Sequence, residues 1–235
     1  MKKFLVLMLT FAMVLCFTAC KNKTDEAALE PDDEVAEDAP AEAGAWVVAD
    51  NTAATLPEEV QTAFDKAAEG TGLVPVAYFG KQIVAGSNYA VLCKEDTALK
   101  VAIIYADLDG NAELTYLKDF DISDYTGGTD GEVTVDEPLT GGWEVPEDYT
   151  VLELPEDVQT AFDTALDTYM GNDFETMAFL GSQVVAGTYN AILCHSELVT
   201  EDYIESIQLV TIYTDPEGKS YISSIVTVDP AAYNE

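Results

Sequence analysis

Apolar and polar residues follow two different spacings along the chain after residue 44. Residues 56–70 place apolar side chains at helical spacing behind a proline and two glutamates, which predicts a helix. Residues 73–93 and 99–122 each hold two β-rich runs joined by small or polar residues, and each segment predicts an antiparallel hairpin. A short apolar run at 46–48 predicts one more strand. This half of the chain is therefore expected to contain a strand, a helix and then four antiparallel strands.

The second half of the chain repeats the first, block by block and in the same order. The matching blocks are 56–65 with 154–163, 80–86 with 181–187, and 103–110 with 211–218. A tandem duplication of a domain-sized unit explains this order. Because each helix must bury its apolar stripe, we predict an α+β fold of two tandem domains, each with one helix packed on an antiparallel sheet. The predicted boundaries are 44–122 for the first domain, 123–140 for a linker and 141–235 for the second domain.

The N-terminal segment has the pattern of an export signal. Two lysines precede an apolar stretch over residues 4–17, and small residues then lead to Cys20. The sequence before Cys20 resembles the lipobox of bacterial lipoproteins, which implies a signal peptide at 1–19, lipidation of Cys20 and an exported, membrane-anchored protein. An ordinary signal cut nearby or an uncut anchor are the alternatives. The acid- and proline-rich residues 20–43 predict a solvated stalk.

The charge of the chain limits its partners. It carries 44 acidic residues against 10 lysines, for a formal net charge of −34. Such a surface repels phosphate, so nucleic acid is not an expected partner. It also disfavours binding to anionic lipid, and contact with a membrane is expected only through lipidated Cys20. A monomer is expected.

The first hairpin of each half carries the same short motif. Its residues are Gln82, Ile83, Val84, Ala85 and Gly86 in the first copy, and Gln183, Val184, Val185, Ala186 and Gly187 in the second. Together with the order of elements, this motif resembles the cystatins and stefins, whose first hairpin carries Gln-x-Val-x-Gly. The resemblance implies two cystatin-like domains and reversible inhibition of papain-like cysteine proteases.

In that family, an N-terminal trunk with a glycine, the motif hairpin and a second hairpin form a wedge that fills the protease cleft. The corresponding trunk residues would be Gly44 in the first copy and Leu139, Gly141 and Gly142 in the second. The second hairpin of the family usually carries Pro-Trp at its turn. Here Pro216 stands near that place, and neither copy has the tryptophan. The first copy has the acid Glu42 where an apolar residue is expected, whereas the second has Leu139. If only one copy inhibits, we therefore expect it to be the second.

A different function class remains open on the same residues. Small residues and a glycine at the turn of a hairpin serve folding alone in many proteins. A fold also does not fix a function. The alternative is therefore a surface adhesion or scaffold module that binds protein or glycan without inhibiting a protease.

No catalytic or metal-binding set is expected, and neither an enzyme activity nor a cofactor is predicted. Cys93 and Cys194 hold the same position in the two copies and are expected to be buried thiols, with a disulfide between them as the alternative. His195 is expected to face solvent, and its neighbour Cys194 would point to the opposite face of the strand, which excludes a nucleophilic pair. The acid-rich turn at 107–111 is a weak candidate for calcium.

Overall fold

The structure is a computed structural model that describes residues 44–49, 55–126, 141–147, 154–167, 169–198 and 204–234. These residues belong to one compact unit. The predicted signal peptide, the whole stalk with Cys20, and most of the linker lie outside the described residues. Within the described residues, no helix has both the length and the apolar composition needed to span a membrane.

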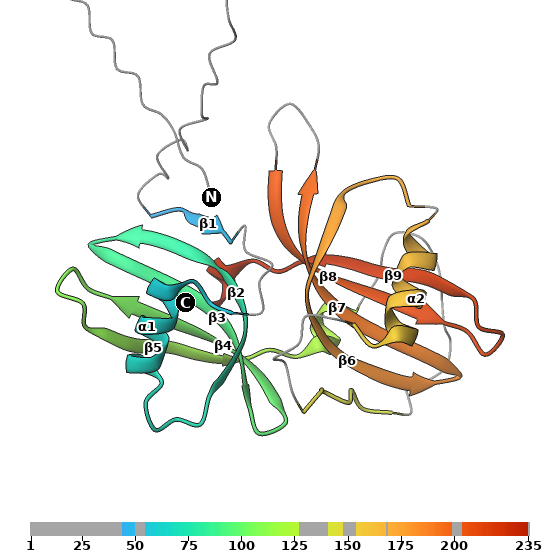
Figure 1. The fold of residues 1–235 in the computed structure, drawn as a ribbon, viewed down its shortest axis with the longest axis horizontal. Coiled ribbons are helices and arrows are strands. Elements are labelled where there is room, and N and C mark those ends of the chain that lie inside the picture. The colour runs from blue at the N-terminus through green and yellow to red at the C-terminus, as the bar shows by residue number, and fades with distance from the viewer. Residues whose placement is uncertain are drawn as a thin grey trace, which may run out of the picture. The chain divides into compact units, whose positions relative to one another are not determined.

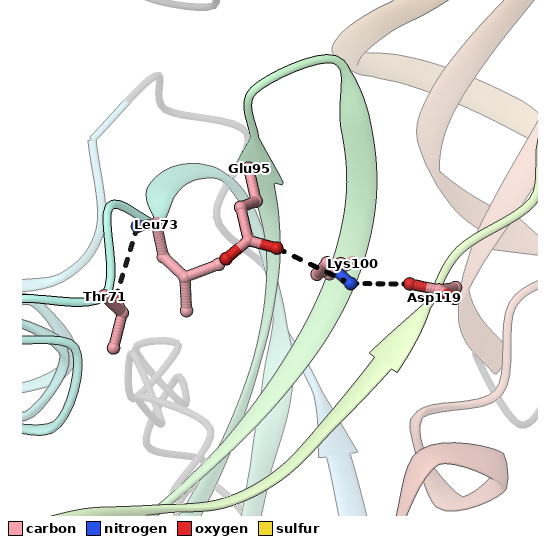
Figure 2. A network of polar contacts seen from close by, with 5 residues as sticks. All are labelled: Thr71, Leu73, Glu95, Lys100 and Asp119. Carbon is pink, nitrogen blue, oxygen red and sulfur yellow. Dashed lines mark hydrogen bonds and ion pairs between the residues drawn. The ribbon is translucent and has the colours of Figure 1, made fainter.

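The first repeat forms a five-stranded antiparallel sheet in the order β1-β2-β3-β4-β5 (Figure 1). Its elements are β1 (Trp46–Val48), α1 (Glu58–Ala67), β2 (Val74–Val84), β3 (Gly86–Glu95), β4 (Ala98–Ala106), β5 (Ala112–Asp119) and the 3-10 helix η1 (Ile122–Tyr125). The predicted helix and both predicted hairpins are confirmed. At the β3–β4 end, Lys100 on β4 joins Glu95 of β3 to Asp119 of β5 at 3.6 and 2.6 Å (Figure 2). One ammonium thus ties three neighbouring strands together where the sheet ends.

The second repeat forms a four-stranded antiparallel sheet in the order β6-β7-β8-β9. Its elements are α2 (Glu156–Leu166), β6 (Asp173–Val185), β7 (Gly187–Leu198), β8 (Ile204–Thr214), β9 (Ser220–Thr227) and the 3-10 helix η2 (Pro230–Tyr233). The counterpart of β1 in this repeat is a single bridge between Glu144 and Ser182.

The helices form where the sequence places their signals. Each begins directly after a proline and has two acidic residues in its first turn, where they oppose the positive end of the helix dipole. In α1, the buried stripe consists of Val60, Ala63 and Phe64, and it packs in a cluster with β-strand residues that include Val91 and Ile104. The second repeat has the equivalent cluster around α2. Each helix covers part of one face of its own sheet.

A third and larger apolar cluster lies between the two repeats. It draws equivalent positions from both sheets, such as Phe79 with Leu180 and Leu92 with Leu193, and these four side chains are fully buried. The remaining buried members are Val76, Ala77, Ala90, Leu99, Val101, Ile103, Phe120, Ile122, Met177, Ala178, Ala191, Ile207, Leu209, Val228 and Tyr233. We call this set the shared core. The second face of each sheet is therefore buried against the other repeat.

The ends of the repeats also meet at the shared core. Tyr125 of η1 and Tyr233 of η2 occupy equivalent positions in the two copies, and their hydroxyl groups are 2.5 Å apart. Phe120 stacks on both rings, with ring centroids 4.9 Å from Tyr125 and 6.4 Å from Tyr233. Lys94 of the first repeat donates hydrogen bonds to the carbonyl oxygens of Pro146 and Glu147 at 2.5 and 3.0 Å.

The predicted fold class is wrong. We expected an α+β fold of two cystatin-like domains, each a helix packed on its own sheet. The described residues are instead mostly antiparallel sheet, with nine strands in two sheets and only two α-helices of ten and eleven residues. Most of the buried hydrophobic side chains belong to strands. The largest cluster, the shared core, contains residues of both repeats. The physical reason is that the strands are apolar on both faces, and a short helix can cover only one of them.

Candidate functional site

Three segments that are distant in the sequence meet at one end of the first sheet. Trp46 on β1 pairs with Gln82 on β2, and Ser87 on β3 pairs with Ala106 at the end of β4. These registers place residue 44, the turn at 84–86 and the turn at 106–112 beside one another. The same segments of the second repeat are residue 141 and the turns at 185–187 and 214–220. We call this end of each sheet its tip.

Hydrogen bonds hold the trunk of each repeat against the motif strand. In the first repeat, the Gly44 N–H donates to the carbonyl of Ile83 at 2.8 Å, and the Gln82 amide donates to the carbonyl of Gly44 at 2.9 Å. In the second repeat, the Gln183 amide donates to the carbonyl of Gly141. The glutamine of the motif therefore acts as a clamp that fixes the trunk to the hairpin.

Close backbone contacts explain the glycines at the tip. A Cβ on Gly141 would lie 2.7 Å from the carbonyl oxygen of Val184, so the trunk could not come this close with any other residue. The motif glycine Gly187 has φ +128°, and a Cβ there would lie 2.5 Å from the carbonyl oxygen of Thr214. Gly86 has the same φ and the same close contact with Ala106. The motif thus requires glycine both for its backbone angle and for contact with the neighbouring turn.

Two tyrosines that we did not single out in the sequence brace the tips. The hydroxyl of Tyr105 donates to the carbonyl of Ala85 at 2.6 Å, and the hydroxyl of Tyr213 donates to the carbonyl of Ala186 at 2.5 Å. Each bond joins the motif turn to the strand that leads into the second turn. The recurrence of tyrosine at the same place in both copies, two residues before an aspartate, was the signal that could have found them.

The side chains that remain exposed on the two motif turns are apolar. Val184 is 63% exposed and Val84 is 41% exposed, whereas Gln183 is buried by its bond to the trunk. Pro216 and Gly142 are also exposed. Leu139 lies outside the described residues, so its predicted place in the trunk stays a prediction.

The two tips are braced differently because one pair of residues is reversed. In the first repeat, Asn88 donates to the Gln82 side chain at 2.7 Å, and Tyr89 is buried on the helix face of the sheet. In the second repeat, Tyr189 takes the place of Asn88 and packs on Tyr213 with ring centroids 4.8 Å apart. The tip of the second repeat is therefore stiffened by an aromatic pair and that of the first by an amide pair.

The chain matches no known family model and no curated protein. The cystatin resemblance of the motif therefore stays a prediction from the sequence.

The cysteines and the histidine form no reactive group. Cys93 and Cys194 are fully buried free thiols, as expected, and they lie in the separate helix-side clusters of the two repeats. Burial raises the pKa of the Cys93 thiol to about 12 and also raises the pKa of Cys194, so neither supplies a thiolate near neutral pH. The prediction that His195 faces solvent is wrong. Its side chain is 3% exposed because the second face of β7 packs against the other repeat rather than facing water, and its Nε2 atom has no hydrogen-bond partner among the described residues.

Among the described residues, no group of three or more histidine, cysteine or acidic side chains could hold a metal ion. The acid-rich turn at 107–111 uses its first carboxylate internally. Asp107 accepts hydrogen bonds from the Asp109 N–H, the Asn111 N–H and the Asn111 amide at 2.8 to 2.9 Å. These bonds lower the pKa of the Asp107 carboxyl and shape the turn.

Proposed function

We propose that the protein is an exported, lipid-anchored inhibitor that blocks papain-like cysteine proteases reversibly by inserting the tip of its second repeat into the protease cleft. The motif residues from Gln183 to Gly187, with the trunk at Gly141, would form the inserted surface. The same role for residues 82–86 and Gly44 of the first repeat is the lesser part of the proposal.

The observation that carries the proposal is the clamped, three-segment tip. A protein that fills a narrow cleft needs backbone segments that come close together and lose little entropy on binding. The Gln183–Gly141 bond, the glycine contact at residue 187 and the Tyr213 bond to Ala186 restrain the segments before any partner arrives. The protruding Val184 then offers an exposed apolar side chain on this restrained surface.

The second repeat is favoured over the first for two reasons. Val184 extends further into solvent than its counterpart in the first repeat, at 63% against 37% for Ile83. The aromatic pair of Tyr189 and Tyr213 braces its turn, whereas the first repeat lacks an aromatic side chain at the position of Tyr189.

The test is a titration of residues 21–235 against papain and against a cathepsin, with hydrolysis of a small fluorogenic substrate as the readout. We expect inhibition with a dissociation constant below about 1 µM, equivalent to about −8.2 kcal/mol. Val184→Glu should weaken inhibition by at least about tenfold, because it places a charge at the desolvated centre of the contact. Ile204→Glu is the matched control, since Ile204 is an exposed strand residue, 54% accessible, at the opposite end of the same sheet.

Two results would count against inhibition. Absence of inhibition at about 100 µM, or weaker than about −5.5 kcal/mol, would leave the tip as the surface of a non-inhibitory binding module. Equal loss of inhibition in the Val184 and Ile204 variants would show that the tip is not the contact.

A further inference from the structure

Each repeat has an open groove between its helix and its second turn. The groove of the first repeat has a volume of about 630 Å³ and that of the second about 650 Å³. The first two turns of the helix form one wall, and the residues around Gly110 or its counterpart Gly218 form the other. Because the repeats are copies, each groove position in one can be compared directly with the same position in the other.

In the first repeat, the chain places its own ammonium group in the groove. Lys66 on α1 lines the groove, and its Nζ atom donates to the carbonyl oxygen of Gly110 at 2.7 Å. A second lysine, Lys81 on β2, lies 3.8 Å from the carboxylate of Glu59 in the first turn of the helix. The Gly110 carbonyl and the Glu59 carboxylate, which both line this groove, are therefore each paired with a lysine of the same repeat.

In the second repeat, both lysines are replaced by short hydroxyl side chains. Thr164 stands in the place of Lys66, and its hydroxyl donates back to the carbonyl of Thr160 in its own helix at 2.7 Å. Ser182 stands in the place of Lys81. The nearby Lys219 does not compensate, because its Nζ atom lies over the ring of Tyr221 at 4.6 Å.

The corresponding acceptors in the groove of the second repeat therefore have no lysine paired with them in the part of the chain that the structure describes. Glu156 and Asp157, in the first turn of α2, line the groove, and no ion pair reaches either carboxylate among the described residues. Within the same residues, no donor bonds the Gly218 carbonyl. The strongly acidic chain adds an attractive field for any cation that approaches.

One amide side chain that lines the groove also has no hydrogen-bond partner among the described residues. Asn190 on β7 lines the groove and is 6% exposed, yet its side chain has no hydrogen bond to any described residue. The first repeat has Tyr89 at this position. The Asn190 amide is not fully enclosed, so it is accessible from the groove and offers both a hydrogen-bond acceptor and a donor to a ligand there.

From this comparison, we infer that the groove of the second repeat binds an alkylammonium group, in the place where Lys66 puts its own ammonium in the first repeat. The Gly218 carbonyl and the Asn190 amide oxygen are the acceptors for its N–H donors, and the carboxylates of Glu156 and Asp157, which line the same groove, add electrostatic attraction. The site lies beside the tip, since Thr188 and Thr214 line the groove and Thr214 contacts Gly187. It does not depend on the proposed inhibition, and any protein bound at the tip could fill it with a lysine side chain.

The experiment is an NMR titration of ¹⁵N-labelled residues 21–235 with two probes: 1,5-diaminopentane and a lysine capped at both backbone ends. We expect saturable shifts of the Asn190 side-chain amide and of the Thr160 and Thr188 backbone amides, with a dissociation constant of about 1 mM for one ammonium among partly exposed acceptors. The capped lysine acetylated on Nζ, at the same ionic strength, is the control probe and should cause no saturable shift. Tighter binding of the diamine by more than about tenfold would identify a free amine as the ligand, and comparable binding would identify a lysine side chain.

Three variants test the assignment of the groove. Thr164→Lys should fill the site from within, as Lys66 does, and abolish binding of both probes, while Thr164→Ser should leave binding unchanged. Asn190→Leu should weaken binding without unfolding the protein, because it removes an unpaired buried amide. The inference is overturned if neither probe gives a saturable shift up to about 10 mM, if the acetylated probe binds equally well, or if Thr164→Lys binds like the unmodified chain.

Discussion

Replacing Phe79 by alanine should destabilise both repeats at once. Phe79 belongs to the first repeat by sequence, but it is fully buried in the shared core and packs on Phe120 with ring centroids 6.4 Å apart. Removal of a buried phenylalanine side chain costs about 3–5 kcal/mol of unfolding free energy. For a chain of this size, where 1 kcal/mol shifts the melting temperature by about 2–4 °C, the loss corresponds to roughly 6–20 °C.

The two tryptophans provide one reporter for each repeat. Trp46 and Trp143 are half-buried against the shared core, so Trp46→Phe and Trp143→Phe leave a single fluorophore in the second or the first repeat. Thermal and urea unfolding would be followed by the fluorescence of each single-tryptophan protein, with and without Phe79→Ala. We expect the transitions reported by both tryptophans to coincide and to shift by the same amount, because the cluster contains residues of both sheets.

A second variant, in the helix-side cluster of one repeat, tests the same cooperativity from a residue outside the shared core. Ile104 is equally buried, but it packs under α1 with residues of the first repeat only. Ile104→Ala should cost about 2–5 kcal/mol, and by destabilising one partner of a cooperative pair it should also lower both transitions. The reasoning would be refuted if Phe79→Ala lowered only the transition seen by Trp46, since the repeats would then unfold as independent domains.

Three further predictions concern single side chains. Tyr213→Phe removes the hydrogen bond that holds the motif turn and should cost about 0.5–1.5 kcal/mol locally; faster hydrogen exchange at Gly187 is the measurement, and unchanged exchange would show that the bond does not brace the tip. Burial and the neighbouring tyrosine hydroxyl raise the pKa of Tyr233, so its phenol stays protonated in the folded state while the unfolded phenol titrates near its usual value of about 10. Stability is therefore fully present below about pH 10 and falls as the pH rises further, and Tyr233→Phe should flatten this alkaline loss in urea midpoints, whereas an identical pH profile would contradict the burial of that phenol. Cys93 and Cys194 should resist a thiol reagent such as dithionitrobenzoate in the native protein and react only after denaturation, because the pKa of each buried thiol is raised; rapid labelling of the folded chain would contradict it.

The sequence was sufficient to locate the elements but not the way in which they pack. The helix over 56–70 and the hairpins turned at 84–86 and 106–112 follow from residue spacing, which is a local property. Burial of the second face of each sheet cannot be read from local spacing, because it depends on how the other repeat packs on that sheet. The same gap explains His195, which looks like a surface residue on its strand and is buried only because another repeat packs above it.

The tip was predictable in part for a similar reason. The repeated motif identified Gln183 and Gly187, since a residue pattern written twice is visible without coordinates. The bond from Tyr213 to Ala186 crosses 27 residues, and the groove acceptors come from a helix, a strand and a turn, so their proximity exists only in the folded chain. The exchange of Lys66 for Thr164 was readable in the sequence, but its meaning required the Gly110 carbonyl that the lysine reaches.

The shared core has a consequence for how the protein behaves on dilution. Equivalent residues of the two copies meet across it, as Tyr125 and Tyr233 do, which is the arrangement of a self-complementary homodimer interface. Two separate copies would dissociate at low concentration, but here both repeats belong to one chain and are joined covalently. Such a connection gives a local concentration in the millimolar range or above, independent of how much protein is present. The duplication thus turns an association that would depend on abundance into a property of each single molecule.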